Sequence, residues 1–180
     1  MLVGLWFTRF ALGQIGQHSL GLWLLGLQVT LYLGLLDLGV VGILPRDVAV
    51  AAGRGAQESD GEAVARTVAE SARLVLWQTP VVAAAAAAMW FAAPSSWVGL
   101  HRPLVVILAV FVVAFPLRTL QAVLQGLQDQ AYIGLVQFAA WAVGTATAVG
   151  LLLAGKGLYA LVASWAIVQL APPLAHWARL

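Results

Sequence analysis

The chain has no cysteine among its 180 residues, and it has few charged residues. The absence of cysteine excludes disulfides, thiolate metal sites and cysteine nucleophiles. Charged residues make up 9% of the chain, whereas soluble domains carry about 25%. The net charge of +2 comes without a basic cluster, which argues against a nucleic-acid partner. Hydrophobic residues make up 62% of the chain and the mean hydropathy is +0.94, so the composition predicts a membrane protein.

The sequence also lacks the motifs of common catalytic sites. Its three histidines, His18, His101 and His176, are far apart in the chain, so the pattern indicates neither a metal cluster nor a catalytic triad. A Gly-Lys-Ser/Thr phosphate-binding loop is absent from the sequence. We therefore expect that the protein is not an enzyme and that it needs no metal or other cofactor.

Long apolar runs predict the fold. A helix needs about 20 apolar residues to cross the hydrocarbon core of a bilayer. Five segments meet this length, and a sixth at the N-terminus is shorter and is interpreted as the second half of a truncated helix. We therefore predict an all-α, polytopic transmembrane helical bundle that forms one lobe over residues 1–180. The expected spans are approximately 1–16, 20–44, 74–93, 103–127, 131–154 and 158–177, with 46–73 as a cytoplasmic loop and amphipathic helix start.

The basic residues predict how the bundle is oriented. Lysine and arginine are enriched in the cytoplasmic loops of membrane proteins. With six spans, five basic residues share one side and three lie on the other, which makes the first side and both termini cytoplasmic. The two sets are Arg46, Arg54, Arg66, Arg73 and Arg179 against Arg9, Arg102 and Lys156.

The segment 103–127 carries an unusual row of polar side chains. Arg118, Gln121, Gln125 and Gln128 stand at i, i+3, i+7 and i+10. At 100° per residue these four positions fall within about 80° of one another on a helix. A charge and three amides on one face of a membrane helix must point at protein or at a water-filled cavity. The row therefore predicts a polar cavity, with interhelical hydrogen bonding as the alternative.

Asp37 is the carboxylate expected at a similar depth. It lies about eight residues before the cytoplasmic end of its predicted span, and Arg118 lies about nine residues before the end of its own, which puts both about 12–14 Å deep. Three roles remain open from the residues alone. The two charges pair and hold the lobe together, or Arg118 contacts a lipid diphosphate through its forked guanidinium, or Asp37 couples transport to a proton or another ion.

Two further residues are candidates for the same cavity. Trp141 follows Gln137 by one helical turn and could stack on sugar rings, although a core tryptophan is the commoner outcome. Arg46 could meet a diphosphate at the cytoplasmic entrance, or could simply determine topology. A row of small residues, Gly26, Thr30 and Gly34, precedes Asp37 on one face of its span, and we interpret this row as a site of close helix packing.

Four short motifs occur in an order and at spacings that resemble a known family. They are Ile15-Gly16-Gln17-His18-Ser19-Leu20-Gly21-Leu22-Trp23, then Leu36-Asp37-Leu38-Gly39 followed by Arg46, then Leu124-Gln125-Gly126-Leu127-Gln128, and finally Gly155-Lys156-Gly157-Leu158. This set is similar to the first lobe of bacterial polysaccharide flippases. Those proteins belong to a superfamily of multidrug, oligosaccharidyl-lipid and polysaccharide exporters.

The resemblance implies a function and a set of partners. Members of the family have two lobes of about six helices, so we expect either a missing C-terminal lobe or a homodimer, in the bacterial cytoplasmic membrane. The implied activity is the flipping of a lipid-linked oligosaccharide or polysaccharide precursor by alternating access, in contact with membrane lipid. Two alternatives remain: half of a drug or toxin extruder of the same superfamily, and a non-transporting scaffold subunit. The scaffold predicts that Arg118 is buried against Asp37 with no cavity reaching it.

Overall fold

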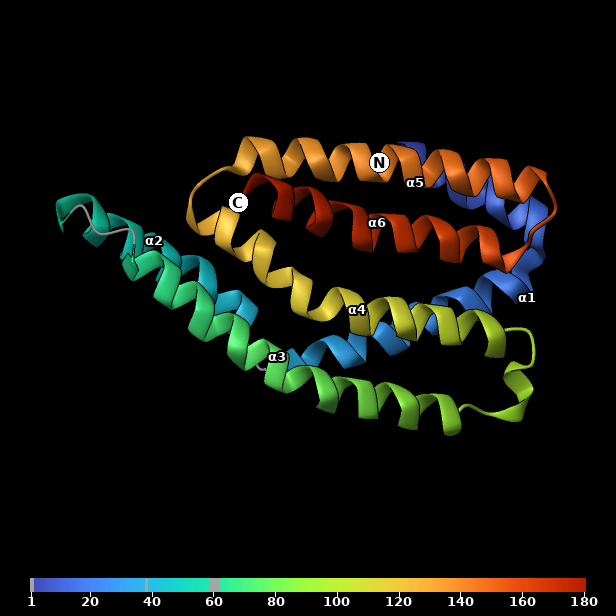
Figure 1. Ribbon diagram of the computed structural model, residues 1–180. Helices are drawn as coiled ribbons and strands as arrows, with labels where there is room; N and C mark the ends of the chain where they lie inside the picture. The colour runs from blue at the N-terminus through green and yellow to red at the C-terminus, as the bar shows by residue number, and fades with distance from the viewer. Residues whose placement is uncertain (1, 38, 59–61) are drawn as a thin grey trace.

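The computed structural model describes residues 2–37, 39–58 and 62–180 and has an all-α architecture, as predicted. Five of its helices, all except α2, are long and apolar enough to cross a membrane, so the chain is built like a multi-pass membrane protein. Figure 1 shows these helices packed lengthwise side by side. The elements in chain order are α1 (Leu2–Gly34), η1 (Leu35–Asp37), α2 (Val40–Glu58), α3 (Glu62–Phe91), η2 (Ser95–Trp97), α4 (His101–Gly126), α5 (Gln130–Leu153) and α6 (Leu158–Arg179).

The N-terminal part of the chain consists of two helical segments that meet near residue 16, as predicted, but it lacks the connecting segment that we expected between them. Residues 2–34 are assigned to one helix, α1, which is interrupted at Gly16, where φ is 76° and ψ is 164°. Glycine adopts this conformation without a steric penalty because it has no Cβ. The ribbon bends sharply there, so the part before Gly16 passes behind α5 and the part after it runs back beneath α4 (Figure 1). The change of direction therefore takes place at one residue, without the connecting segment that we expected.

The predicted span 20–44 and the predicted loop 46–73 were also wrong in their boundaries. The helix α1 ends at Gly34, and α2 begins at Val40. Most of the expected loop is helical, because α2 reaches Glu58 and α3 begins at Glu62 rather than at residue 74; residues 59–61 lie outside the described residues. Alanine is frequent in both stretches and favours helix. The polar composition of residues 46–73 thus favoured a loop, but polar residues are equally compatible with a helix that is exposed to solvent.

The last three predicted segments are helices in the structure, and their ends agree with α4, α5 and α6 within two residues. The centre of the bundle is α4, whose side chains Leu104, Ile107, Phe111 and Phe115 are almost completely buried. This core is completed by residues of α1, such as Leu33, and by residues of α3. In Figure 1, α4 lies between α6 on one side and α1 and α3 on the other. The polar row of α4 is therefore held inside the bundle by its apolar neighbours.

Glycines mark the points where helices cross most closely. A methyl group on Gly26 of α1 would lie 3.1 Å from Cδ1 of Ile107 on α4, which supports the predicted packing role of that small residue. On α5, a methyl group on Gly144 would lie 3.0 Å from the carbonyl oxygen of Ser164 on α6. Small residues let membrane helices approach closely enough for van der Waals contact. These crossings fix α1 and α6 against the helices that carry the site.

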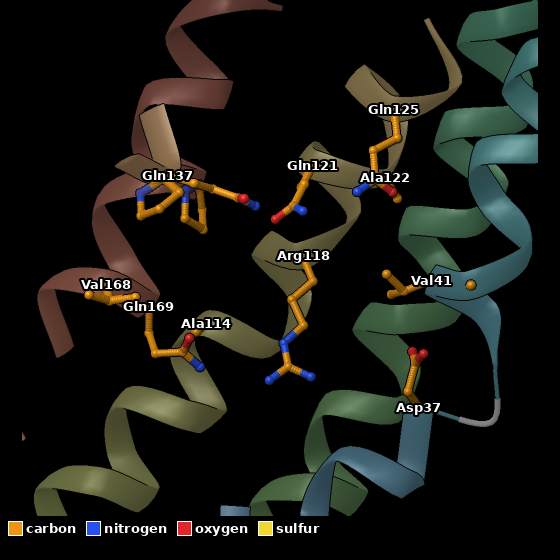
Figure 2. Close-up of a pocket in the computed structure, with 13 residues that line it drawn as sticks. Asp37, Val41, Ala114, Arg118, Gln121, Ala122, Gln125, Gln137, Val168 and Gln169 are labelled. Atoms are coloured by element: carbon orange, nitrogen blue, oxygen red, sulfur yellow. The ribbon is translucent and has the colours of Figure 1, made fainter. Parts of the chain in front are cut away.

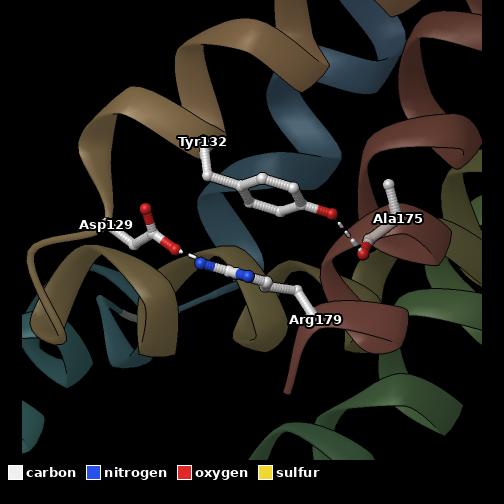
Figure 3. A network of polar contacts seen from close by, with 4 residues as sticks. All are labelled: Asp129, Tyr132, Ala175 and Arg179. Atoms are coloured by element: carbon white, nitrogen blue, oxygen red, sulfur yellow. Dashed lines mark hydrogen bonds and ion pairs between the residues drawn. The ribbon is translucent and has the colours of Figure 1, made fainter.

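The end of α6 is fastened to the start of α5. Arg179 forms an ion pair with Asp129, with Nε 3.3 Å from Oδ2, and its guanidinium lies 5.3 Å from the centre of the Tyr132 ring. The hydroxyl of Tyr132 donates to the carbonyl oxygen of Ala175 at 2.8 Å. Figure 3 shows these contacts linking the two helices. Because they hold α6 beside α5, they also set the position of the α6 residues that face the cavity.

Candidate functional site

A polar cavity of about 620 Å³ opens beside the middle of α4. Its polar lining comes from four elements that are distant in the sequence: α4, η1, α5 and α6. Figure 2 shows the side chains of Gln121 and Gln137 extending toward the same space, from α4 and α5 respectively. The polar side chains in the lining are those of Arg118, Gln121, Gln125, Asp37, Gln137 and Gln169. The cavity thus combines one cation, one carboxylate and four amides.

Arg118 lines this cavity and is partly buried. Its guanidinium carbon lies 4.8 Å from the centre of the Phe111 ring, one face of which it covers, and such contacts attract a cation electrostatically. A methyl group on Gly34 would lie 4.0 Å from Nη1 of Arg118, so the guanidinium also lies beside the C-terminal end of α1. The C-terminus of a helix carries partial negative charge, which favours a nearby cation. These contacts orient the side chain of Arg118, and none of them is an ion pair.

Asp37 and Arg118 do not form an ion pair with each other, which was one of the three roles that the sequence left open. Both Asp37 and Arg118 line the cavity, and in Figure 2 their side chains do not meet: Arg118 lies between Gln169 and Asp37. The physical reason is the early end of α1, which places Asp37 in the short 3₁₀ turn η1 instead of deep within a continuous helix. The role in which this pair holds the lobe together is therefore wrong.

Asp37 lies instead against α3. The amide nitrogen of Gln78 donates to the backbone oxygen of Asp37 at 3.5 Å, a long bond. Oδ1 of Asp37 and Oε1 of Gln78 are both enclosed and have no hydrogen-bond partner in the structure. Two enclosed acceptors without a donor are a costly arrangement, because a buried polar group loses its bonds to water.

Three prolines lie at or next to the cavity wall and change its backbone. Proline has no N–H, so the carbonyl four residues earlier in a helix loses its usual donor. Pro172 and Pro173 of α6 affect Val168 and Gln169 in this way, and all four residues line the cavity. Pro45 of α2 does the same to the lining residue Val41. In membrane proteins such freed carbonyls are tolerated where they meet water or other polar groups.

Three of the predicted site residues lie elsewhere. Gln128 follows the end of α4, with φ of 63°, and lines a separate hollow beside Asp129 and Arg179. The polar row on α4 therefore does not include Gln128, because the helix ends at Gly126. Trp141 is 43% exposed and packs against Phe138, with ring centres 5.9 Å apart.

Arg46 is the third of these residues. It is exposed on α2 and is not part of the cavity lining, whereas Gly42, one turn earlier, is. The side chain of Arg54, which we grouped with it for orientation, lies outside the described residues. The role of Arg46 as a cavity entrance therefore has no support in the geometry.

Two polar residues of the lining, Gln137 and Gln169, were not among the predicted site residues. Gln169 lines the cavity and lies near Ala114 in Figure 2, on the side of Arg118 away from Asp37. A signal for it was present, because Gln169 is an isolated amide in an apolar span and precedes a double proline by a few residues. Polar residues within membrane spans usually face the protein interior. A single amide has no periodicity, however, so its direction could not be predicted.

Comparison with known proteins found no match to this chain among family models, curated proteins or solved structures. The similarity to flippases therefore rests on the short motifs alone. One of them, Leu36-Asp37-Leu38-Gly39, includes residue 38, which lies outside the described residues. Any functional assignment has to be argued from the cavity itself.

Replacing Asp37 by asparagine is expected to leave stability unchanged or to raise it by about 1 kcal/mol, because a neutral amide replaces a carboxylate whose enclosed Oδ1 has no hydrogen-bond partner. Breaking a buried ion pair would instead cost about 3–5 kcal/mol. The free energy of unfolding in detergent measures the difference. The matched control is Asp129→Asn, which removes the observed, partly exposed pair with Arg179 and should cost at most about 1 kcal/mol. A loss of 3 kcal/mol or more for Asp37→Asn would contradict our description of the site.

Proposed function

We propose that the chain is one lobe of a transporter that moves the polar, anionic part of a lipid-linked oligosaccharide or polysaccharide precursor across the bacterial cytoplasmic membrane. The observation that carries the proposal is the cavity of about 620 Å³, which is lined by Arg118 and four glutamines. A guanidinium is suited to phosphate oxygens because its N–H groups form a planar fork. Glutamine amides both donate to and accept from hydroxyl groups, which suits sugars.

The backbone supports the same substrate class. The prolines at the cavity wall free carbonyl groups at Val168 and Gln169, and these are acceptors for hydroxyl donors. An apolar substrate would leave such acceptors without partners, which is costly in a water-poor site. The lining therefore favours a ligand that carries both phosphate and many hydroxyl groups.

The positions of Arg118 and Asp37 favour a role in transport over a role as a scaffold. A scaffold was expected to bury Arg118 against Asp37, whereas both side chains line a cavity and form no ion pair with each other. A cavity needs walls on all sides, so in the proposed transporter a second lobe or a second copy of this chain covers the open side. Both termini are cytoplasmic in this arrangement, with Lys156 at the outer surface.

One observation favours a second candidate, the drug or toxin extruder. Asp37 lines the same cavity as Arg118, and a carboxylate is the group that would hold a cationic drug. We rank this function lower because Oδ1 of Asp37 is enclosed and cannot contact a ligand in this structure. The side chain of Arg118 would also repel a cation that entered the cavity.

Flipping can be measured in inside-out membrane vesicles from the host cell, so that the chain keeps its native partners. The probe is a fluorescent farnesyl diphosphate joined to N-acetylglucosamine, and its passage is followed by chemical quenching of the exposed leaflet. We expect flipping that disappears in vesicles from a deletion strain and returns when the gene is restored. If the deletion instead abolishes only the transport of a cationic dye, the chain is part of an extruder. Unchanged flipping in the deletion strain contradicts the proposal.

A further inference from the structure

A second hollow meets the polar cavity at Arg118. It has a volume of about 390 Å³ and is formed by the second half of α1, by α4 and by α6. Arg118 and Gln169 line both spaces. The remaining lining of this second hollow is mostly apolar and consists of Leu27, Thr30, Leu31, Gly34, Leu35 and Phe111. A polar space and a largely apolar space therefore share one cationic boundary.

The guanidinium lies at that boundary. The ring of Phe111 and the residue Gly34, which lie beside the guanidinium, both line the second hollow. Gln121 and Gln125 follow Arg118 along α4 and line only the polar cavity. An anion bound to Arg118 would thus have amide groups on one side and hydrocarbon on the other.

The apolar hollow is open at the surface of the bundle. Leu31 is 62% exposed and Leu35 is 71% exposed, and both belong to the hollow. Leu31 and Leu35 follow Leu27 along the chain from α1 into η1. All three belong to a segment that is long and apolar enough to cross a membrane. Side chains on such a surface face lipid tails or another apolar segment.

From this arrangement we infer that the hollow lined by Leu27, Leu31 and Leu35 binds the apolar tail of an amphiphile whose diphosphate lies on Arg118. The order along the ligand is then polar head, anion and hydrocarbon tail, which matches the order of amides, guanidinium and leucines. This inference deepens the proposed function and rests on it. It assigns a path by which a prenyl chain leaves the protein for the bilayer while the sugars occupy the polar cavity.

Binding to the purified 180-residue chain in phosphatidylcholine nanodiscs tests this inference with two radiolabelled probes, farnesyl diphosphate and inorganic diphosphate. Empty nanodiscs correct for partitioning of the prenyl chain into lipid. The test variant is Leu31→Gln/Leu35→Gln. The matched control is Leu135→Gln, at a leucine that is 66% exposed on α5. Because all three leucines are exposed, these variants should fold, which circular dichroism and gel filtration verify.

We expect farnesyl diphosphate to bind the unmodified chain about tenfold or more tightly than inorganic diphosphate, since the tail buries apolar surface. Leu31→Gln/Leu35→Gln should weaken farnesyl diphosphate about tenfold, and it should leave inorganic diphosphate unchanged. Leu135→Gln should change neither affinity. Arg118→Gln should weaken both probes.

The outcomes separate failure of the inference from failure of the proposed function. If Arg118→Gln weakens both probes but the paired leucine variant behaves like Leu135→Gln, the tail path is wrong and the anion site stands. If Arg118→Gln changes neither affinity, the anion site is wrong, and the inference falls with it. If neither probe binds to the unmodified chain, both the inference and the proposed anion site are wrong.

Discussion

Flipping is expected to fall about 100-fold or more when Arg118 is replaced by glutamine. A guanidinium forms two charge-assisted hydrogen bonds to a phosphate group, and each contributes about 1.5–3 kcal/mol. Glutamine keeps a polar side chain of similar reach and removes the charge. The change should therefore act on the anion, with little effect on folding, because Arg118 has no ion pair to lose among the described residues. The measurement is the initial rate of probe flipping in inside-out vesicles.

Two companion variants make this result specific. Arg118→Lys keeps the charge and loses the forked geometry, so its rate should lie between those of the unmodified protein and Arg118→Gln. Arg66→Gln removes an exposed arginine of α3 that does not line the cavity, and its rate should match that of the unmodified protein. Equal rates for Arg118→Gln and Arg66→Gln would show that the cavity arginine has no role in transport.

Replacing Gln121 and Gln125 together by leucine is expected to reduce flipping of the sugar-bearing probe about tenfold. The two amides line the cavity on α4, and each hydrogen bond to a hydroxyl group contributes about 0.5–1.5 kcal/mol. Leucine is similar in size and favours helix as well as glutamine does. The same vesicle assay measures the rate, and membrane abundance of the variant is checked on immunoblots.

The cause of such a loss can be separated from a packing defect. Gln28→Leu is the matched control, because Gln28 is exposed on α1 and away from the cavity lining. A probe without the sugar, farnesyl diphosphate carrying the same dye, should be flipped by the Gln121→Leu/Gln125→Leu variant at nearly the rate of the unmodified protein. If both probes slow equally, the glutamines support the helix packing of the lobe and do not bind sugar.

The polar row of α4 was predictable because it depends on helix geometry alone. Arg118, Gln121 and Gln125 lie on one helix and face one space, as their spacing required. Gln128 was mispredicted because the helix ends two residues earlier, at Gly126. Periodicity is informative inside a helix and loses meaning beyond its last turn, where the backbone takes a different direction.

The sequence by itself determined that the chain is helical, that five of its helices can cross a membrane and that α4 has a polar face. These features follow from local composition and from the fixed rotation per residue of a helix. Tertiary structure decided which residues join that face. It brings Gln137 and Gln169 from other helices to the cavity that Arg118 lines, and it places Asp37 in η1 because α1 ends at Gly34. Distances between helices depend on how side chains distant in the sequence pack together, and that packing cannot be read from the local periodicity of one segment.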